Sequence, residues 1–152
     1  MKYDKLLSLF AEHLEKQDIL SKLTEAEELH NCSYSEIHTI DSIGKITNPN
    51  VTKIANHLRM TRGAISKITK RLLVAEMIES YFLSNNKKEI YFKLTEKGKY
   101  IFQEHKKRHF LWEERDSTFF EKYSDEEIKI IINFMGQFNE YLNEQIKILT
   151  SK

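Results

Sequence analysis

The chain has 152 residues, of which 40% are hydrophobic and 31% are charged, with a formal net charge of +1. This length fits one domain or two closely joined halves, and the apolar content is enough for a core, which excludes a disordered chain. No apolar run approaches the ~20 residues of a membrane-spanning helix, and charges among the first apolar positions argue against a signal peptide. Cys32 is the single cysteine, so no internal disulfide can form and we expect a cytoplasmic protein without a membrane partner.

The first half of the chain predicts two helices. Gly (4) and Pro (1) are scarce, which favours a mainly helical chain because strand-rich folds need more turn residues. Apolar residues at helical spacing predict a first helix over residues 3–22. The sequence "SYSE" places Ser33 and Glu36 as a capping box, in which each side chain bonds the backbone N–H of the other residue. We therefore expect a second helix from Ser33 to near Gly44.

Two shorter helices are predicted next. The loop "TNPN" ends in Asn50, a residue type that caps helices, and the apolar spacing that follows indicates a short buried helix. Thr61 caps a third helix, predicted over residues 61–76. One face of this helix is apolar, with Ile65, Ile68, Leu72 and Leu73, and the opposite face is polar and basic.

The periodicity changes after this helix. Residues 78–94 are rich in Ile, Tyr and Phe on both sides of "SNNKK", which predicts a β-hairpin with its turn at Asn85–Asn86. A long helix is predicted over roughly 95–117, and Ser124 with Glu127 forms a second capping box that opens the last helix. The apolar side chains of that helix are expected to be buried: Ile128, Ile131, Ile132, Met135, Phe138, Leu142 and Ile146.

A helix, a short turn, a second helix and a two-stranded hairpin together form a winged helix-turn-helix. The segment "VTKIANHLRMTRGAISKITKRLLVAEMIESYFLSNNKKEIYFKLTEKG" resembles the DNA-binding core of the MarR family in its order of buried positions, its Thr-x-x-Ile-Ala-x-x-Leu start, its wing and its closing "LTEKG". The resemblance implies a mainly α fold with a small β-hairpin wing. It also implies a winged helix-turn-helix DNA-binding domain at residues 33–99 and a helical dimerisation region formed by residues 1–32 plus 100–152.

The distribution of charge favours DNA as a partner. Residues 1–44 have a net charge of −5, residues 45–99 of +8 and residues 100–152 of −2, so the basic middle region is the part expected to face a polyanion. Arg62 and Ser66 are best placed for base edges, and the lysines and arginine further along for phosphates. A merely solvated helix face is the alternative. The expected DNA contacts are Thr61, Arg62, Gly63, Ser66, Lys67, Lys70 and Arg71 of the recognition helix, and Asn85, Asn86, Lys87 and Lys88 of the wing tip.

Two positions depart from the family pattern. The Asp and Arg pair that usually braces the wing is replaced by "SNNKKE", and Glu76 stands where the family tends to place Gly after the recognition helix. Both departures leave the orientation of the wing open.

The resemblance implies a homodimer, in which the first helix and the last two helices interdigitate around a two-fold axis. Apolar residues from Ile128 to Leu149 exceed what a lone terminal helix could hide, although packing against the first helix of the same chain is the alternative. Two-fold symmetry places two recognition helices one DNA turn apart. We therefore expect a pseudo-palindromic operator, and repression as the mode of action.

The sequence "QEHKKRHF" places His105 and His109 on one face of a helix. The zinc-responsive branch of the MarR family has a similar pair, preceded by Glu and joined by a His on the second helix, and Glu104 and His38 match these residues. The branch adds a carboxylate near the end of the first helix, for which Asp18 is the nearest match. The resemblance thus implies a regulatory zinc site, since three imidazoles and a carboxylate suit tetrahedral zinc.

Several alternatives stay open for this site. Glu27, Glu28 and His30 compete with Asp18 as the remaining ligand, and Ile37 stands where the branch places the Glu of a second site. Taken alone, a histidine is more often a solvated or core residue than a ligand. Nickel, cobalt and copper accept the same ligand types as zinc.

The sequence leaves open two other kinds of switch and two other protein classes. A small aromatic ligand, or oxidation of Cys32, could control DNA binding without any metal. An enzyme is disfavoured, because the histidine pair lacks the Glu that zinc proteases place after the first His, and because no glycine-rich phosphate loop is present. A structural DNA-bridging protein, which binds without sequence preference, is the remaining class.

Overall fold

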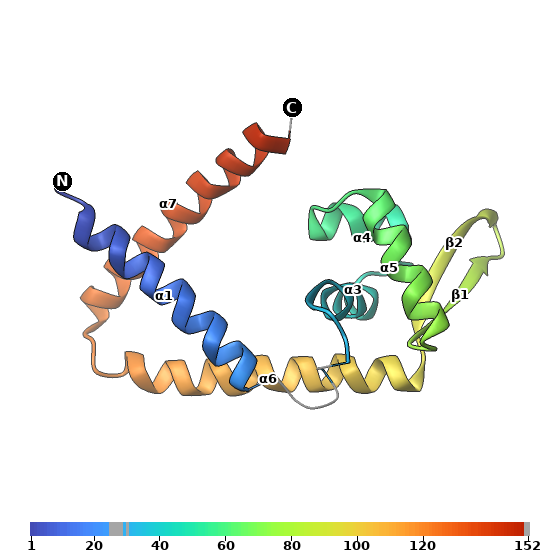
Figure 1. Cartoon of the computed structure of the whole chain (residues 1–152), viewed down its shortest axis with the longest axis horizontal. Helices are drawn as coiled ribbons and strands as arrows, with labels where there is room; N and C mark the ends of the chain where they lie inside the picture. The colour runs from blue at the N-terminus through green and yellow to red at the C-terminus, as the bar shows by residue number, and fades with distance from the viewer. Residues whose placement is uncertain (25–28, 30, 151–152) are drawn as a thin grey trace. The chain divides into compact units, whose positions relative to one another are not determined.

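A computed structural model describes residues 1–24, 29 and 31–150, and within them it shows six helices and one two-stranded antiparallel sheet (Figure 1). The described chain forms two compact units, residues 1–109 and 110–152, and one helix begins in the first unit and ends in the second. The fold is mainly α with a β-hairpin wing, as the sequence predicted. The elements in chain order are α1 (Asp4–Leu23), α3 (Tyr34–Lys45), α4 (Val51–Leu58), α5 (Arg62–Val74), β1 (Ile78–Leu83), β2 (Asn86–Leu94), α6 (Glu96–Phe120) and α7 (Asp125–Thr150).

Local hydrogen bonds explain where several helices begin. At α3 the predicted capping box is present: the Glu36 N–H donates to the Ser33 hydroxyl at 3.2 Å, and the Ser33 N–H donates to the Glu36 carboxylate at 3.1 Å. Asn50 caps α4 by accepting a backbone N–H at 2.8 Å. The box predicted at the start of α7 also forms, between Ser124 and Glu127. These helix starts follow from contacts within a single turn of chain.

One apolar core joins α3, α4, α5, the sheet and the start of α6. The apolar faces predicted for α4 and α5 supply Ile54, Ile65 and Leu72, which are at most 2% exposed. Because the buried faces of both helices are fixed in this core, the opposite face of α5 is held toward solvent. The buried members of the core are Leu29, Cys32, Ile37, Ile40, Ile43, Ile54, Ala55, Ile65, Ile68, Leu72, Met77, Ile78, Phe92 and Ile101.

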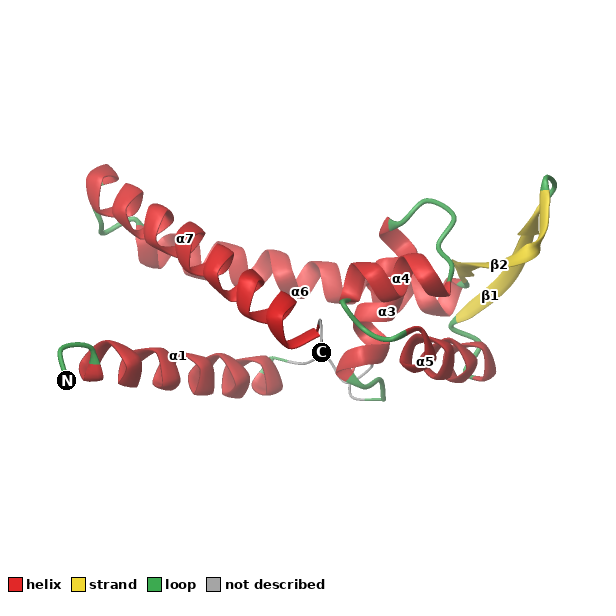
Figure 2. Cartoon of the chain, turned by 90° about the horizontal axis from the view of Figure 1, so that it is seen from above, coloured by secondary structure: helices red, strands yellow, loops and turns green. Residues whose placement is uncertain are grey.

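The hairpin extends beyond the helices of the first unit as a two-stranded ribbon (Figure 2). Its turn consists of Ser84 and Asn85, one residue earlier than the sequence predicted, because Leu83 pairs with Asn86 across the ribbon. The side-chain oxygen of Asn86 then accepts two backbone N–H groups of β2, both at 3.2 Å. Asn86 therefore shapes the wing tip rather than extending freely from it.

The loop between α3 and α4 braces the hairpin in place of the missing Asp and Arg pair. The side-chain amide of Asn50 donates to the Glu89 carboxylate at 3.0 Å, and the Tyr81 hydroxyl donates to the side chain of Asn48 at 2.9 Å. The Phe92 N–H donates to a carbonyl oxygen of the same loop at 2.9 Å. These three bonds fix the wing against the start of α4, so its orientation is determined by a different set of residues from the one in the family pattern.

A polar junction connects the end of α5 to the start of α6. The Thr95 hydroxyl donates to the Glu76 carbonyl oxygen at 2.7 Å and accepts the Gly98 N–H at 3.1 Å. Gly98 packs so closely that a Cβ there would lie 2.0 Å from the Met77 carbonyl oxygen. Glu76 has a φ of 56°, in the left-handed region. Glycine occupies this region at little cost, which gives the family preference for Gly at this position a physical reason.

The helices α1 and α7, each taken by itself, bury none of their described side chains within the chain. The burial predicted for the last helix is not found in the single chain, where Ile131 is 37% exposed and Ile132 is 65% exposed. On α1, Leu7 and Leu14 are likewise exposed. Apolar helix faces of this kind mark surfaces that associate with another molecule. None of the described helices is long and apolar enough to cross a membrane.

Candidate functional site

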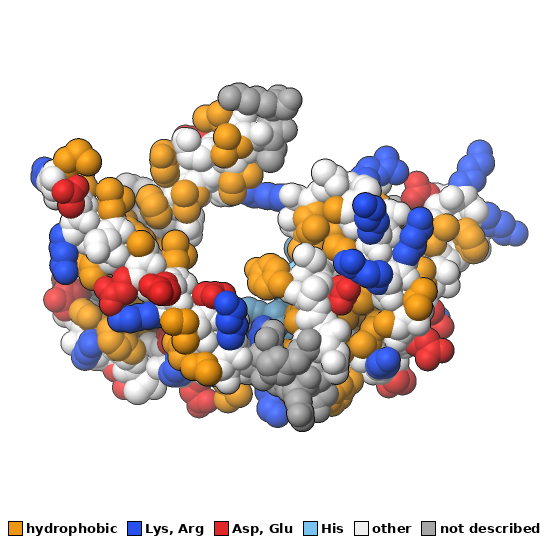
Figure 3. Space-filling view, in the orientation of Figure 1, with side chains coloured by type: hydrophobic (Ala, Val, Ile, Leu, Met, Phe, Trp, Pro, Cys, Tyr) orange, Lys and Arg blue, Asp and Glu red, His pale blue; other side chains and the backbone are white. Residues whose placement is uncertain are grey.

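Helix α5 presents a polar and basic face opposite its buried face. Thr61 caps the helix, as predicted, by accepting the Ala64 N–H at 3.1 Å. Arg62 is exposed in the first turn, and Lys67 and Lys70 are exposed further along. Figure 3 shows lysine and arginine side chains gathered over α5 and at the hairpin tip. A capped helix that exposes polar and cationic residues matches the size and chemistry of the major groove.

Gly63 leaves open space in the first turn of α5. A Cβ built there meets no heavy atom within 4 Å, so packing among the described residues does not require glycine. A glycine inside a helix costs about 0.5–1 kcal/mol relative to alanine. The open space leaves room for a partner to approach this turn of the helix closely. Ser66, also expected to contact DNA, is half-buried one turn further on.

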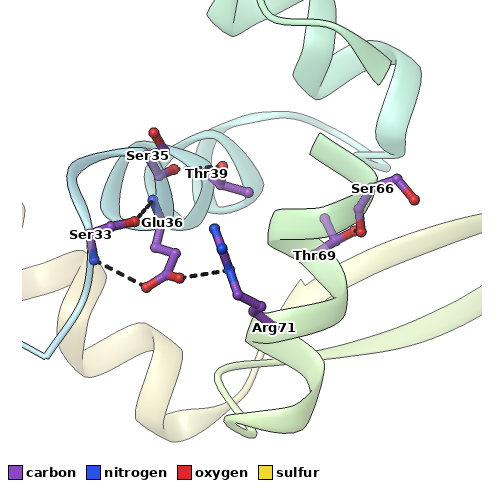
Figure 4. Close-up of polar contacts among 7 residues, drawn as sticks. All are labelled: Ser33, Ser35, Glu36, Thr39, Ser66, Thr69 and Arg71. Carbon is purple, nitrogen blue, oxygen red and sulfur yellow. Dashed lines mark hydrogen bonds and ion pairs between the residues drawn. The ribbon is translucent and has the colours of Figure 1, made fainter. Parts of the chain in front are cut away.

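Arg71, which the sequence assigned to a phosphate, has a partner within the chain. Its Nε lies 3.1 Å from Oε1 of Glu36, while the other oxygen of Glu36 accepts the Ser33 N–H in the capping box of α3 (Figure 4). The Arg71 side chain is nevertheless 62% exposed, against 17% for Glu36. The recognition helix is thus connected to the first turn of α3 by an ion pair.

The wing tip carries two exposed lysines. Lys87 and Lys88 are exposed, as is Asn85. Asn86 is half-buried, and its side-chain amide oxygen accepts hydrogen bonds within the turn. The hairpin therefore brings two lysines to the end of a braced ribbon. Of the predicted wing residues, these lysines are the best suited to a phosphate contact.

Three histidines predicted as metal ligands lie together. His38 of α3 meets His105 of α6 edge to face, with ring centres 5.4 Å apart, and the ring centres of His105 and His109 are 4.5 Å apart. The Nε2 atoms of this second pair are 3.1 Å apart, which is hydrogen-bond distance. The ring of Tyr34, at the start of α3, lies 4.1 Å from that of His38. We refer to His38, His105 and His109 as the histidine cluster.

Burial controls the protonation of His105 and His38. It lowers the pKa of His105 to about 4, with a further lowering from His109, and the side chain is 3% exposed. Burial likewise lowers the pKa of His38, whereas the charge of Asp41 opposes the change at both residues. Nδ1 of His105 is buried without a hydrogen-bond partner among the described residues. At neutral pH both rings are therefore uncharged, which is the form that binds metal ions.

The donor chemistry of the cluster suits a divalent ion, but its present arrangement is not a finished site. Within residues 1–24, 29 and 31–150, no three His, Cys, Asp or Glu side chains are grouped so that they could hold one ion. Asp18 lies exposed on α1, where its carboxylate accepts a hydrogen bond from Lys22 at 2.6 Å. Glu104 is half-buried on α6. Three rival ligands lie outside the described residues, namely Glu27, Glu28 and His30.

The structure also shows the surroundings of Cys32 and a cavity, which concern the two switches without a metal: oxidation and a small aromatic ligand. Cys32 is buried in the core, and burial raises the pKa of its thiol, which disfavours the reactive thiolate. A cavity of about 730 Å³ lies where the hairpin meets α3 and α6. Two ion pairs, Lys93 with Glu79 and Lys99 with Glu96, line it together with apolar side chains. The apolar part of the lining includes Ile43, Ile46, Phe92, Leu94 and Phe102.

Known proteins resemble this chain in sequence. The MarR family model matches residues 32–90. The HTH-type transcriptional regulator PchR of Bacillus subtilis is 38% identical over 111 residues, which are 73% of this chain, and the match spans 66% of PchR. The transcriptional regulator ZitR of Lactococcus lactis is 31% identical over 134 residues, which are 86% of this chain and 87% of ZitR. The chain belongs to the MarR family.

Solved structures of MarR-type proteins share the fold of this MarR-family chain. FabT of Streptococcus pneumoniae, solved in complex with DNA, superposes with a TM-score of 0.79 at 21% identity, covering 94% of this chain and 99% of FabT. ZitR of Lactococcus lactis, described as a zinc-responsive MarR family member, gives a TM-score of 0.73 at 22% identity, covering 90% of this chain and 99% of ZitR. These likenesses concern the fold: the helices and the two-stranded hairpin of this chain superpose on those of the two proteins.

Three residues near the histidine cluster and the recognition helix have contacts that the sequence did not predict, namely Tyr34, Asp41 and Glu36. Tyr34 and Asp41 flank His38 on α3 at helical spacing, four residues before it and three after it, and this spacing was a signal that could have indicated both. Glu36 was assigned only its capping role. Its ion pair with Arg71 joins two helices that are distant in sequence, so no local pattern indicates it.

Proposed function

We propose that this MarR-family protein is a sequence-specific DNA-binding transcriptional regulator that represses by occupying a pseudo-palindromic operator. The observation that carries the proposal is the exposed basic face of α5 beside a braced wing with two lysines at its tip. PchR and ZitR are named as transcriptional regulators, and FabT was solved with DNA, which supports the same role here. Phosphate contacts by these cations release counterions, so we expect affinity to fall steeply with salt.

We propose that the working form is a homodimer. The apolar faces of α1 and α7 are uncovered in the single chain, as the exposure of Leu14, Ile132 and Leu149 shows. A second copy of the chain can cover these faces, and it supplies the second recognition helix that a palindromic site requires.

We further propose that zinc or a similar divalent ion binds at the histidine cluster and controls DNA affinity. Two rings held neutral by burial, together with the unpartnered Nδ1 of His105, support this proposal. His38 belongs to α3 whereas His105 and His109 belong to α6, so an ion would tie the two helices together. The rings must first leave their mutual hydrogen bond, and Asp18 or Glu104 is the carboxylate that the sequence suggests for the remaining position.

The ion can change DNA affinity only through its different affinity for the DNA-fitting arrangement and for the other arrangement of the protein. If it favours the DNA-fitting arrangement, it is a co-repressor. We propose this direction because an ion that links α3 to α6 also restrains the winged helix-turn-helix, which packs on these two helices.

One experiment tests these proposals separately. Binding to a duplex from the upstream promoter region and to a random duplex is measured with zinc, with a chelator, and for a His105→Ala/His109→Ala variant. We expect zinc to raise affinity for the promoter duplex, and the chelator and the variant to lower it alike. A His13→Ala variant, altered at an exposed histidine of α1, serves as the control and should behave as wild type. Equal affinity for the promoter duplex under all conditions contradicts metal control and leaves the DNA-binding proposal standing. Equal affinity for the promoter and random duplexes contradicts the proposal of a sequence-specific regulator and favours a DNA-bridging protein.

A small aromatic ligand is the second candidate effector. The 730 Å³ cavity at the base of the wing lies within the size range of small-molecule sites. A ligand there would contact both the hairpin and α6. Calorimetric titration with salicylate as the probe tests this alternative in the presence of chelator. Heat of binding accompanied by release of the promoter duplex favours the ligand over the metal.

A further inference from the structure

In the ion pair between α5 and α3, Glu36 has both carboxylate oxygens engaged, whereas Arg71 makes its contact through one nitrogen. Oε1 of Glu36 lies 3.1 Å from Nε of Arg71, and Oε2 accepts the Ser33 N–H at 3.1 Å (Figure 4). Both carboxylate oxygens of Glu36 are therefore engaged, and the capping box holds the carboxylate in place with little exposure. Glu36 is a fixed acceptor at the edge of the recognition helix.

Arg71 keeps most of its donors. A guanidinium group carries five N–H donors in a planar fork, and its contact with Glu36 is made through Nε. The side chain remains 62% exposed. The ion pair at Nε holds the guanidinium group beside Glu36, and the two Nη groups remain as donors for a phosphate. An arginine that is already held also loses less rotamer freedom when it binds.

Lys70 lies beside Arg71 at the end of α5 and adds a second cation. Both border a shallow and mainly apolar hollow, together with Val74 and Ala75. Val74 is 87% exposed, so the hollow faces solvent. Cations on the flank of a recognition helix meet the backbone of the groove that the helix enters.

We propose that Glu36 is a positioning residue for DNA binding, which holds Arg71 so that its Nη edge meets a backbone phosphate. This inference rests on the proposed DNA-binding function. Two other roles are possible for the same pair. Glu36 could compete with the phosphate for Arg71, or the pair could be a structural link between helices without any effect on DNA.

For a Glu36→Gln variant, positioning predicts a change in DNA affinity of opposite sign to the one that the other two roles predict. A carboxylate near DNA repels phosphates, so removal of its charge alone raises DNA affinity. Competition predicts the same increase, and a structural link predicts no change beyond that charge effect. Positioning predicts a decrease, because Arg71 is no longer held by a charged acceptor.

The variants can be chosen so that the helix start is preserved. Glutamine also completes a capping box, so Glu36→Gln removes the charge and keeps the cap of α3. Arg71→Ala removes the phosphate contact, and the double variant closes a thermodynamic cycle. Glu12→Gln is the control, since Glu12 is also a helix acid with a cation partner, Lys16 at 2.5 Å on α1.

Affinity for the promoter duplex and for a random duplex is measured over a range of salt concentrations. We expect Arg71→Ala to weaken both duplexes alike and to reduce the salt slope by about 1. Glu36→Gln should weaken both by about three- to tenfold, because the ion pair that holds Arg71 is lost, with no further loss when Arg71 is already alanine. Glu12→Gln should not weaken binding.

Several results would overturn the inference. Tighter binding by Glu36→Gln indicates competition or simple charge repulsion, and an undiminished loss in the Arg71→Ala background places its effect elsewhere. An unchanged salt slope in Arg71→Ala excludes the phosphate contact. Should Glu36→Gln prove unfolded in thermal melts, Arg71→Lys provides the same test, since lysine keeps the charge but lacks Nε, and wild-type affinity in that variant contradicts the inference. Wild-type protein that binds neither duplex contradicts the proposed function instead.

Discussion

The Nε2 atoms of His105 and His109 lie 3.1 Å apart on successive turns of α6, close enough for one ring to donate a hydrogen bond to the other. Such a bond requires at least one ring with a free lone pair. Burial lowers the pKa of His105 to about 4, so above that pH this ring is neutral and has a lone pair on one of its two nitrogens, according to the tautomer. A proton or a metal ion would take that lone pair.

Lower pH should therefore destabilise the metal-free protein. The pKa of His105 is lower in the folded chain than the ordinary value of 6.5, so the unfolded chain takes up the proton first and unfolding becomes more favourable as pH falls. The contribution of His105 is complete above about pH 6.5 and is lost toward pH 4, where it amounts to a decrease on the order of 3 kcal/mol at about 1.4 kcal/mol per pKa unit. Urea unfolding at a series of pH values, with chelator present, measures this decrease.

A His105→Leu variant is the control for this pH dependence. It places an apolar side chain in the buried position and removes the titrating ring. We expect a flatter dependence of the unfolding free energy on pH, and an unaltered dependence would assign the effect to another group.

Zinc should raise the thermal unfolding midpoint of the wild-type protein. An ion that binds only the folded state adds about 2.7 kcal/mol of stability when its concentration exceeds its Kd by about a hundredfold. His38→Ala, His105→Ala and His109→Ala should each lose most of the zinc-induced increase, whatever their midpoint without zinc. His13→Ala should retain it, and the full increase in all three cluster variants would contradict the proposed metal site.

Arg62 and Lys87 should have different effects on DNA recognition. We expect Arg62→Ala to lower the ratio of promoter to random-duplex affinity, because a lost base contact costs about 1–3 kcal/mol at the matching sequence. Lys87→Ala should weaken both duplexes alike, since phosphates carry no sequence information. Fluorescence anisotropy with both duplexes measures the ratio. If Arg62→Ala leaves it unchanged, Arg62 does not read base edges.

Gly63→Ala should separate stability from DNA affinity. Alanine is expected to stabilise the fold by about 0.5–1 kcal/mol, since it meets no neighbour within 4 Å, and to weaken DNA binding by occupying space that DNA needs. Gly98→Ala should have the opposite effect on stability, because its Cβ would lie 2.0 Å from the Met77 carbonyl oxygen. Urea unfolding and duplex binding are measured on both variants. Undiminished DNA affinity of Gly63→Ala would show that this turn of α5 stays clear of DNA.

Glu76→Gly should stabilise the protein. The backbone of Glu76 is in the left-handed region, where a residue with a Cβ is disfavoured by roughly 1–2 kcal/mol. The greater freedom of glycine in the unfolded chain offsets part of this gain, so we expect a net increase of about 0.5–1 kcal/mol in the free energy of unfolding. A decrease measured in urea would indicate that the Glu76 side chain makes a stabilising contact that outweighs the strain.

Local patterns predicted the fold well because most helix starts are determined within four residues. The boxes at Ser33 and Ser124 and the cap at Asn50 are examples of such short-range bonds. The hairpin turn was displaced by one residue because its register depends on cross-strand pairing. Contacts between distant segments, such as Asn50 with Glu89, carry no local signature.

The candidate site shows the same division. Helical spacing identified His105 and His109 as a pair, and the fold that the sequence resembles brought His38 toward them. The carboxylate ligand depended on the packing of α1 and of the segment after it, which the spacing of residues does not encode. The pairing of Arg71 with Glu36 was equally out of reach, since each residue already had a sufficient local explanation.

The uncovered apolar face of α7 has a consequence for how the amount of protein matters in the cell. This helix of 26 residues has none of its described side chains buried within its own chain. Its stability therefore depends on contact with another molecule that buries its apolar face. If that molecule is a second copy, folding and assembly are one concentration-dependent equilibrium. A scarce chain would then be both partly unfolded and unable to span two half-sites. Synthesis and degradation of the protein would act on its target genes through the same surface, alongside any ion or ligand.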